Sequence, residues 1–146
     1  MDALYEVWRP RLLRYCTQLL HHGHDAEEVV QDVFTKLVAG GDRRRLDGQP
    51  EVLLFRMARN RCIDVRRKHA PQARDDLAPS ARDEEPGRDL REAIARLPFD
   101  QREALVLTAI DGVGYREAAA ILGVSLGTVA ARRGAAIQEL QRRLAP

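Results

Sequence analysis

The sequence predicts an all-α protein built from two small helical domains that a flexible linker joins. Apolar residues recur at helical spacing along most of the chain. Aromatic residues make up only 5% of it and runs of alternating β-branched residues are missing, which argues against a β-sandwich or barrel. Residues 69–88 show no periodicity and carry prolines and an acidic run, as flexible segments do. We therefore predict a domain over 1–68, the linker over 69–88 and a domain over 89–146.

The charge distribution supports this division. The net charge of the 146-residue chain is only +2. Residues 1–68 carry 13 Lys and Arg against 10 Asp and Glu, residues 69–88 carry 3 against 5, and residues 89–146 carry 8 against 7. Two basic flanks around an acidic middle are what two DNA-facing domains on one tether would show.

Cysteine usage and hydropathy indicate a cytoplasmic protein. Cys16 and Cys62 form no CxxC pair and are too few for a disulfide framework, so we expect reduced thiols. The start of the chain lacks the basic and apolar regions of a signal peptide. The longest strongly apolar run, 104–110, is too short to span a bilayer. We expect no membrane insertion.

No arrangement of residues in the sequence suggests catalysis, a P-loop or a dinucleotide site, so we expect neither enzyme activity nor a cofactor. His21, His22 and His24 cluster downstream of Cys16. Their spacing matches no standard zinc pattern, and a loop of exposed histidines explains them equally well. We expect no metal site.

The first domain is predicted to hold three helices. The first runs from about Leu4 to Leu20, with Pro10 expected to kink or restart it. The second is predicted to begin at an N-cap, Asp25, with Glu28 completing a capping box, and to run to about Val38.

The third predicted helix, about 51–68, has one apolar and one cationic face, and an arginine-rich loop, 43–45, precedes it. A solvated charged face is the ordinary interpretation of such a run, whereas the neighbouring loop favours a nucleic-acid surface. The polar face consists of Arg56, Arg59, Asn60, Arg61, Arg66, Arg67 and Lys68.

The second domain is predicted to hold helices over about 89–97, 100–111, 115–122 and 125–144. Asp100 is the expected N-cap of the second of these, with Glu103 three residues on.

The strongest local signal is a helix-turn-helix over 115–134. Ala119 supplies the small residue where two helices cross, Gly123 the turn residue with positive φ, and Val129 the apolar residue that packs back. The second helix of the motif can then enter a major groove. A plain helical hairpin is the alternative. Arg133 falls in the apolar stripe of the last helix, from which we expect it to reach outward.

Three blocks of the sequence follow one another in a recognisable order: DAEEVVQDVFTKL, then LLFRMARNRCIDVRRK, then IARLPFDQREALVLTAIDGVGYREAAAILGVSLGTVAARR. In this order they resemble the extracytoplasmic-function (ECF, group IV) sigma factors of the sigma-70 family. The resemblance implies a region 2-like domain, a region 4-like domain and promoter recognition on core RNA polymerase. It also implies contacts to the β′ clamp and the β flap, and an anti-sigma factor as a further partner.

The resemblance assigns candidate residues to each surface. The implied polymerase-binding residues are Asp25, Glu28, Gln31, Asp32 and Phe34. The implied residues on the minus-ten side of the promoter are Arg43, Arg44, Arg45, Arg59, Asn60, Asp64, Arg66, Arg67 and Lys68. The implied helix-turn-helix residues for the minus-thirty-five element are Tyr115, Ser125, Gly127, Thr128, Ala131, Arg132 and Arg133.

The sequence departs from the family pattern at two places, and two alternatives stay open. Leu53 stands where the family usually has tryptophan. Alanine and isoleucine stand where the last helix usually has a Lys-Ser pair and further basic residues, at Ala130, Ala131, Ala135 and Ile137. The alternatives are a sigma-like decoy that binds an anti-sigma factor, and a conventional helix-turn-helix regulator that binds an operator.

Overall fold

The computed structural model describes residues 2–20, 23–40, 49–68 and 88–145, and these are helices joined by turns, without a strand among them. The prediction of an all-α fold is confirmed. The helices are α1 (Asp2–Leu20), α2 (Gly23–Ala39), α3 (Pro50–Lys68), α4 (Arg88–Ala95), α5 (Phe99–Leu105), the π-helix η3 (Val106–Ile110), α6 (Tyr115–Leu122) and α7 (Leu126–Leu144). The predicted linker lies outside the described residues, except that Arg88 already begins α4.

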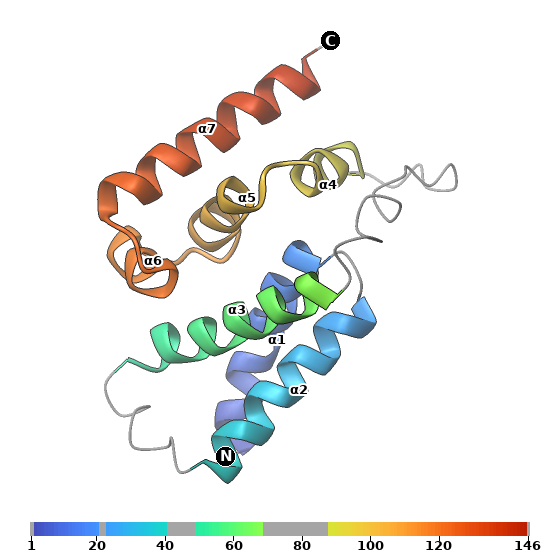
Figure 1. Cartoon of the computed structure of the whole chain (residues 1–146), viewed down its shortest axis with the longest axis vertical. Helices are drawn as coiled ribbons and strands as arrows, with labels where there is room; N and C mark the ends of the chain where they lie inside the picture. Colours follow the sequence, from blue (N-terminus) through green and yellow to red (C-terminus); the bar gives the residue numbers. More distant parts are fainter. Residues whose placement is uncertain (1, 21–22, 41–48, 69–87, 146) are drawn as a thin grey trace.

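Helices α1, α2 and α3 pack on one another around an apolar core (Figure 1). The rings of Tyr15 in α1 and Phe55 in α3 meet edge to face, with centroids 5.2 Å apart, and both side chains are fully buried. Helix α1 does not restart at Pro10 and runs unbroken through it. The buried face that follows Pro10, including Leu12 and Leu19, fixes the second half of the helix against its neighbours.

Two of the predicted N-caps are wrong. Helix α2 begins at Gly23, so Asp25 lies in its first turn, where its charge still suits the helix dipole. Helix α5 begins at Phe99 after the N-cap Pro98, and the carboxylate of Asp100 accepts only the neighbouring amide of Gln101, at 2.8 Å. In both places the helix starts before the capping side chain that the local pattern favoured.

The predicted helix over 100–111 changes its winding halfway. Its second part is η3, where the amide of Asp111 donates to the carbonyl oxygen of Val106 at 2.9 Å. A π turn of this kind inserts one residue and rotates the residues after it about the helix axis. Its consequence here is that the Asp111 side chain, with no exposed area, points toward α1.

Helices α4 to α7 form the second domain, with α7 lying across α4, α5 and α6 on the side away from the first domain (Figure 1). The two domains pack directly against each other, α3 against α6 and α1 against α4, α5 and η3. One continuous set of buried apolar side chains runs from Leu12 in α1 to Val129 and Ala136 in α7. Both domains therefore share a core.

Candidate nucleic-acid and partner-binding surfaces

The outer face of α2 carries most of the predicted polymerase-binding residues. Glu28, Gln31 and Asp32 are exposed and Asp25 is half-buried. Phe34 lies beneath this face, because it is only 5% exposed and its ring meets that of Tyr5 edge-on at 4.9 Å. The surface is thus acidic and polar, and Phe34 supports it from below.

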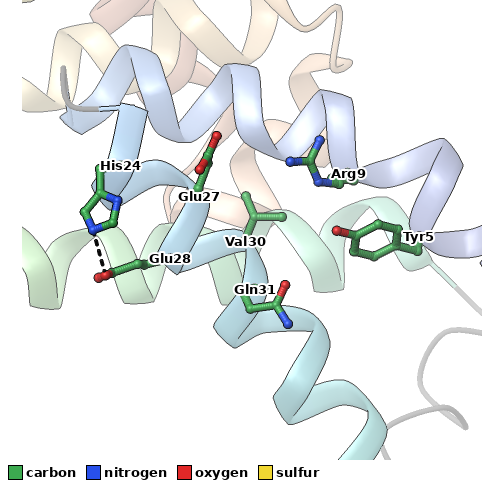
Figure 2. A pocket seen from close by; sticks show the side chains of 7 residues that line it. All are labelled: Tyr5, Arg9, His24, Glu27, Glu28, Val30 and Gln31. Atoms are coloured by element: carbon green, nitrogen blue, oxygen red, sulfur yellow. Dashed lines mark ion pairs between the residues drawn. The ribbon is translucent and has the colours of Figure 1, made fainter.

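A shallow depression of about 250 Å³ lies between α1 and this face of α2 (Figure 2). His24 and Glu28 form an exposed ion pair on its rim, with 3.1 Å between Nε2 and Oε1. Charged and aromatic side chains from both helices line it, which suits the side chain of a protein partner better than a small apolar ligand. The lining residues are Tyr5, Arg9, His24, Glu27, Glu28, Val30 and Gln31.

One face of α3 is exposed and polar. Asn60, Asp64, Arg67 and Lys68 lie on it at a spacing of three to four residues, which places them in one row along the helix. We call this row the exposed α3 stripe. Next to it, Arg61 donates to Asp32 of α2 with 3.0 Å between Nε and Oδ2, so the stripe and the acidic α2 face adjoin.

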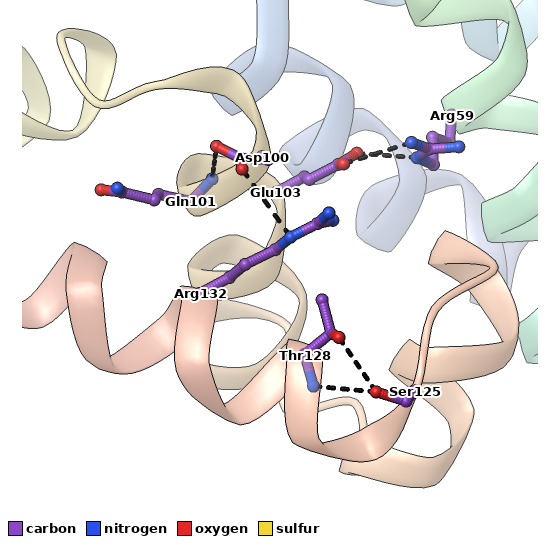
Figure 3. Close-up of polar contacts among 7 residues, drawn as sticks. All are labelled: Arg59, Asp100, Gln101, Glu103, Ser125, Thr128 and Arg132. Atoms are coloured by element: carbon purple, nitrogen blue, oxygen red, sulfur yellow. Dashed lines mark hydrogen bonds and ion pairs between the residues drawn. The ribbon is translucent and has the colours of Figure 1, made fainter.

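Arg59 and Arg66, two turns apart on α3, instead face α5. The guanidinium of Arg59 donates to both carboxylate oxygens of Glu103, from Nε at 2.7 Å and from Nη2 at 3.2 Å (Figure 3). The Glu103 side chain is only 2% exposed. The guanidinium of Arg66 lies 3.9 Å from the ring centroid of Phe99. The hydrogen bond to Glu103 raises the pKa of Arg59, and burial lowers the pKa of Arg66.

Two further polar contacts join the domains. Arg14 of α1 donates to the buried carboxylate of Asp111, with 2.9 Å between Nε and Oδ1. Burial raises the pKa of Asp111 and the Arg14 charge opposes that shift. Arg102, 6% exposed, donates to the carbonyl oxygens of Leu19, Ala95 and Leu97 at 3.1, 2.7 and 3.0 Å. Burial lowers the pKa of Arg102 to about 10.

The predicted helix-turn-helix is confirmed in its geometry. Helices α6 and α7 meet at 98°, within the range typical of this motif. Gly123 adopts φ +70° in the turn, and Val129 packs back with no exposed area. The carbonyl oxygen of Ala119 accepts the amides of both Gly123 and Val124. The hydroxyl of Ser125 caps α7 by accepting the amide of Thr128 at 3.1 Å.

The outward face at the start of α7 is small and weakly polar. Ser125, Gly127 and Ala131 are exposed, and the Ser125 and Thr128 hydroxyls lie 2.9 Å apart (Figure 3). The two predicted arginines turn aside from this face. Arg132 lies 3.7 Å from the Asp100 carboxylate of α5, and the half-buried Arg133 stacks toward the Tyr115 ring at 5.8 Å.

Some predicted residues lie outside the described part of the chain. These are the loop arginines Arg43, Arg44 and Arg45, and His21 and His22. Among the residues that the structure describes, no three His, Cys, Asp or Glu side chains gather as metal ligands. Within the same residues, no single helix is long and apolar enough to cross a membrane; the bent pair of α6 and α7 passes that test only when its two helices are taken together.

Sequence reasoning missed the polar contacts between the domains. Arg14, Phe99, Arg102 and Asp111 were assigned no role, and Glu103 was expected only to complete a helix cap. The partners of these contacts lie 44, 83 and 97 residues apart, so no local spacing signals them. In the sequence Glu103 stands between Arg102 and Ala104, and nothing in this pattern indicates a cation in the other domain.

Two family models match the chain, one in each half. The sigma-70 region 2 family model matches residues 4–72, and the sigma-70, region 4 model matches residues 87–140. The chain is 31% identical over 159 residues to the ECF RNA polymerase sigma factor SigE of Mycolicibacterium smegmatis, covering 99% of this chain and 61% of that protein. It is 30% identical over 132 residues to the ECF RNA polymerase sigma factor EcfG of Rhodopseudomonas palustris, covering 84% and 73%.

Two solved structures share the fold. One is the sigma factor RpoE in complex with the anti-sigma factor NepR from Bartonella quintana, with a TM-score of 0.81, 28% identity and coverage of 98% of this chain and 95% of that one. The other is CnrH in complex with the cytosolic domain of CnrY, with a TM-score of 0.77, 26% identity and coverage of 98% and 86%.

A basic helical domain packed on a helix-turn-helix domain defines a two-domain transcription factor. The family matches make this specific: the chain belongs to the ECF RNA polymerase sigma factors. Sigma factors of this family bind core RNA polymerase and direct transcription initiation at promoter DNA, and the family is not a class of enzymes.

Proposed function

We propose that this chain is a group IV sigma factor that acts in the cytoplasm, docks on core RNA polymerase and holds promoter DNA at two places without catalysing a reaction itself. One observation carries the proposal: the acidic α2 face and the exposed α3 stripe adjoin through the contact between Arg61 and Asp32. A polymerase surface bound to α2 therefore lies beside any DNA bound to α3.

In this proposal the α2 face docks on the clamp helices of the β′ subunit. Glu28, Gln31 and Asp32 are exposed and offer carboxylate and amide groups to a basic or polar partner helix. Phe34 and Tyr5 hold the face in place by their ring contact. The region 4-like domain meets the β flap in the same scheme, which supplies a second attachment to the enzyme.

The exposed α3 stripe is our proposed contact to the minus-ten side of the promoter. Arg67 and Lys68 can neutralise phosphates, which gives affinity without sequence preference. Asn60 offers both a donor and acceptors, and Asp64 offers acceptors, so these two can pair with the edges of unstacked bases. The loop arginines Arg43, Arg44 and Arg45 join this surface on sequence grounds alone.

The helix-turn-helix is our proposed contact to the minus-thirty-five element. Ser125 and Thr128 offer hydroxyls, and Gly127 and Ala131 let the α7 backbone approach the duplex closely. Arg132, Arg133 and Tyr115 flank this face. With few long donors on the face, we expect recognition to depend on phosphate contacts and DNA shape more than on direct base contacts.

The physical role of the protein is then to offset the cost of opening DNA. Unstacking costs a few kcal/mol per disrupted step. A cationic surface that retains one strand recovers part of this cost. Two weak DNA surfaces attached to one polymerase also raise each other's effective concentration.

Reconstitution with core RNA polymerase tests the proposal. We expect run-off transcripts from a promoter library with the wild-type chain, and about tenfold fewer open complexes when Arg67 and Lys68 are both changed to Ala, because two phosphate contacts are lost. Arg96→Ala, which removes one exposed positive charge at a residue assigned to none of the DNA contacts, is the control. Open-complex formation that is unchanged in the double variant contradicts the role of the stripe. Sequence-specific DNA binding without any polymerase binding favours an operator-binding regulator instead.

A second candidate function is a sigma-like decoy that binds an anti-sigma factor. Two observations favour it: one of the solved structures named above is a complex with an anti-sigma factor, and the outward face of α7 has few DNA-contacting groups. The same reconstitution separates the two candidates. Polymerase binding without specific transcripts supports the decoy, whereas specific transcripts support the sigma factor.

A further inference from the structure

The start of α7 presents apolar side chains on the side where a helix-turn-helix meets DNA. Leu126, the first residue of the helix, is 47% exposed, although nothing in the protein requires an apolar side chain in water. Ala130 and Ala131 are exposed one turn further along, beside Leu126. Val129 is fully buried and fixes which side of α7 faces outward. The first turns of a recognition helix are the part that contacts base edges in the major groove. Here they offer mainly methyl groups.

The polar groups at the same place are largely taken by contacts within the protein. The Ser125 hydroxyl accepts the Thr128 amide at 3.1 Å, and the two hydroxyl oxygens lie 2.9 Å apart, so only one of their two hydrogens is left for DNA (Figure 3). Arg132 extends toward Asp100 of α5, with 3.7 Å between Nε and Oδ2. Few donors and acceptors therefore remain on this face to read base edges by hydrogen bonds.

The major groove of unmodified DNA contains one kind of apolar group, the C5-methyl group of thymine. The other bases present hydrogen-bond donors and acceptors there, and an apolar side chain leaves these atoms without partners, which costs free energy. Burial of one methyl group against an apolar side chain tightens binding by about fourfold. Both effects have the same direction, so an apolar reading surface selects thymine.

We propose that α7 recognises the minus-thirty-five element by apolar contact with thymine methyl groups, and that Leu126 is the residue that determines this specificity. Ala130 and Ala131 extend the apolar surface and are short enough to let the helix lie deep in the groove. Arg132 and Arg133 beside this face can neutralise phosphates, which favours DNA over an apolar protein partner. The proposal rests on the proposed function, because it takes the outward face of α7 as a DNA contact.

Uracil in place of thymine tests the proposal, because it removes the methyl group and keeps the hydrogen bonds of the base pair. Core RNA polymerase carrying the full chain first selects duplexes from a pool randomised over both promoter elements, with core enzyme alone as the background. The affinity is then measured for a selected duplex with thymine and with uracil throughout its upstream element. A duplex with uracil only in the spacer between the two elements is the DNA control.

The protein variants are Leu126→Ala and Leu144→Ala. Both leucines belong to α7 and are similarly exposed, at 47% and 43%, so neither change leaves a cavity in the core. Leu144 lies at the other end of the helix and is the matched control. The quantity compared is the ratio of the affinities for the thymine and the uracil duplex, which cancels any change in polymerase binding.

We expect the wild type and Leu144→Ala to bind the thymine duplex about fourfold more tightly than the uracil duplex, and the spacer control to show no difference. In Leu126→Ala most of this preference should be lost. If the wild type does not distinguish the two duplexes, the proposal is overturned and the proposed function is untouched. A preference that persists in Leu126→Ala overturns the role of Leu126.

Two further outcomes are decisive. Loss of polymerase binding in Leu126→Ala, together with equal wild-type affinities for the two duplexes, overturns the proposal and assigns this face to a protein partner. If no duplex is enriched over core enzyme alone, the proposed function fails and this proposal fails with it.

Discussion

At the scale of single residues, Arg102 shows how one buried cation can stabilise two domains. Its guanidinium donates to Leu19, at the end of α1, and to Ala95, the last residue of α4. The last carbonyl groups of a helix lack intrahelical partners and carry the negative end of its dipole. Arg102 therefore satisfies two helix ends at once and needs no carboxylate to balance its charge.

Replacing Arg102 by Met tests this role. The apolar chain keeps much of the volume, but three buried carbonyl oxygens lose their donor. We expect the free energy of unfolding to fall by about 3 kcal/mol, measured by urea denaturation. Arg102→Lys keeps the charge with fewer donors and should lose less. An unchanged midpoint in Arg102→Met would show that water or other groups take over these carbonyls.

The sequence predicted some residue roles and not others, for a physical reason. The Ser125 cap was found because Gly123 just before it fixes where α7 can begin. Asp25 and Asp100 are not N-caps, because α2 already begins at Gly23 and α5 begins directly after the N-cap Pro98. Arg59 was correctly noted as a cation of α3, but its partner Glu103 lies 44 residues away. The local sequence pattern identifies the hydrogen-bond donor, but it does not identify the distant acceptor that folding brings next to that donor.

At the scale of elements, the helix-turn-helix depends on one left-handed residue. Gly123 has φ +70°, a backbone conformation that alanine adopts only at a cost in free energy. No neighbouring atom would clash with an added Cβ atom, so the backbone conformation alone is the cause. Gly134 lies within α7 with open space around it, where alanine is the better helix former. Substitution by alanine should therefore have opposite effects at the turn and within α7.

We expect Gly123→Ala to lower the free energy of unfolding by about 1 kcal/mol and Gly134→Ala to raise it by a similar amount. Thermal unfolding followed by circular dichroism measures both, and each variant is the control for the other. Equal shifts of the same sign would contradict the assignment of the turn.

Helix α7 also carries a pH-dependent element near its end. Arg142 and Arg143 both donate to Glu139 and lower the pKa of that carboxyl to about 2 from 4.5. Between these two values the unfolded chain binds more protons, so the stabilisation is complete above pH 4.5 and is lost as the pH falls toward 2. The melting temperature of the wild type should exceed that of Glu139→Gln above pH 4.5, and the gap should close on acidification.

Because these side chains are exposed, added salt should narrow the gap as well. A difference in melting temperature that stays constant from neutral pH down to 2 would show that the ion pairs of Glu139 do not stabilise the protein.

Element types were largely predictable, and element endings were less so. The turn glycine Gly123 ends the helix over 115–122, and the capping serine Ser125 starts the helix over 126–144. These two residues made both boundaries predictable. The π turn at 106–110 carries no such marker in the sequence. The residue after it, Asp111, accepts a hydrogen bond from Arg14 of the other domain, and local spacing does not signal that contact.

At the scale of the whole molecule, the shared core makes the two domains one folding unit. Buried side chains continue from α1 through α3 into α6 and α7. We therefore expect a single unfolding transition. Trp8 is the only tryptophan and reports on the first domain alone, whereas circular dichroism reports on all helices.

The two signals should share one midpoint in urea. They should separate in Glu103→Gln, where the contact between domains is weakened. Midpoints that already differ in the wild type would show that the domains unfold independently. Two family models match separate stretches, residues 4–72 and 87–140, and such a boundary in sequence is compatible with a shared core in space.

Cys16 and Cys62 lie in this shared region with no exposed area, and hydrogen bonding with Cys62 together with burial raises the pKa of the Cys16 thiol. A thiol held protonated and out of contact with solvent does not meet an alkylating reagent until the helices around it part. The rate at which iodoacetamide alkylates these two thiols therefore measures how often α1 and α3 separate, so the native cysteines report on local unfolding of the first domain.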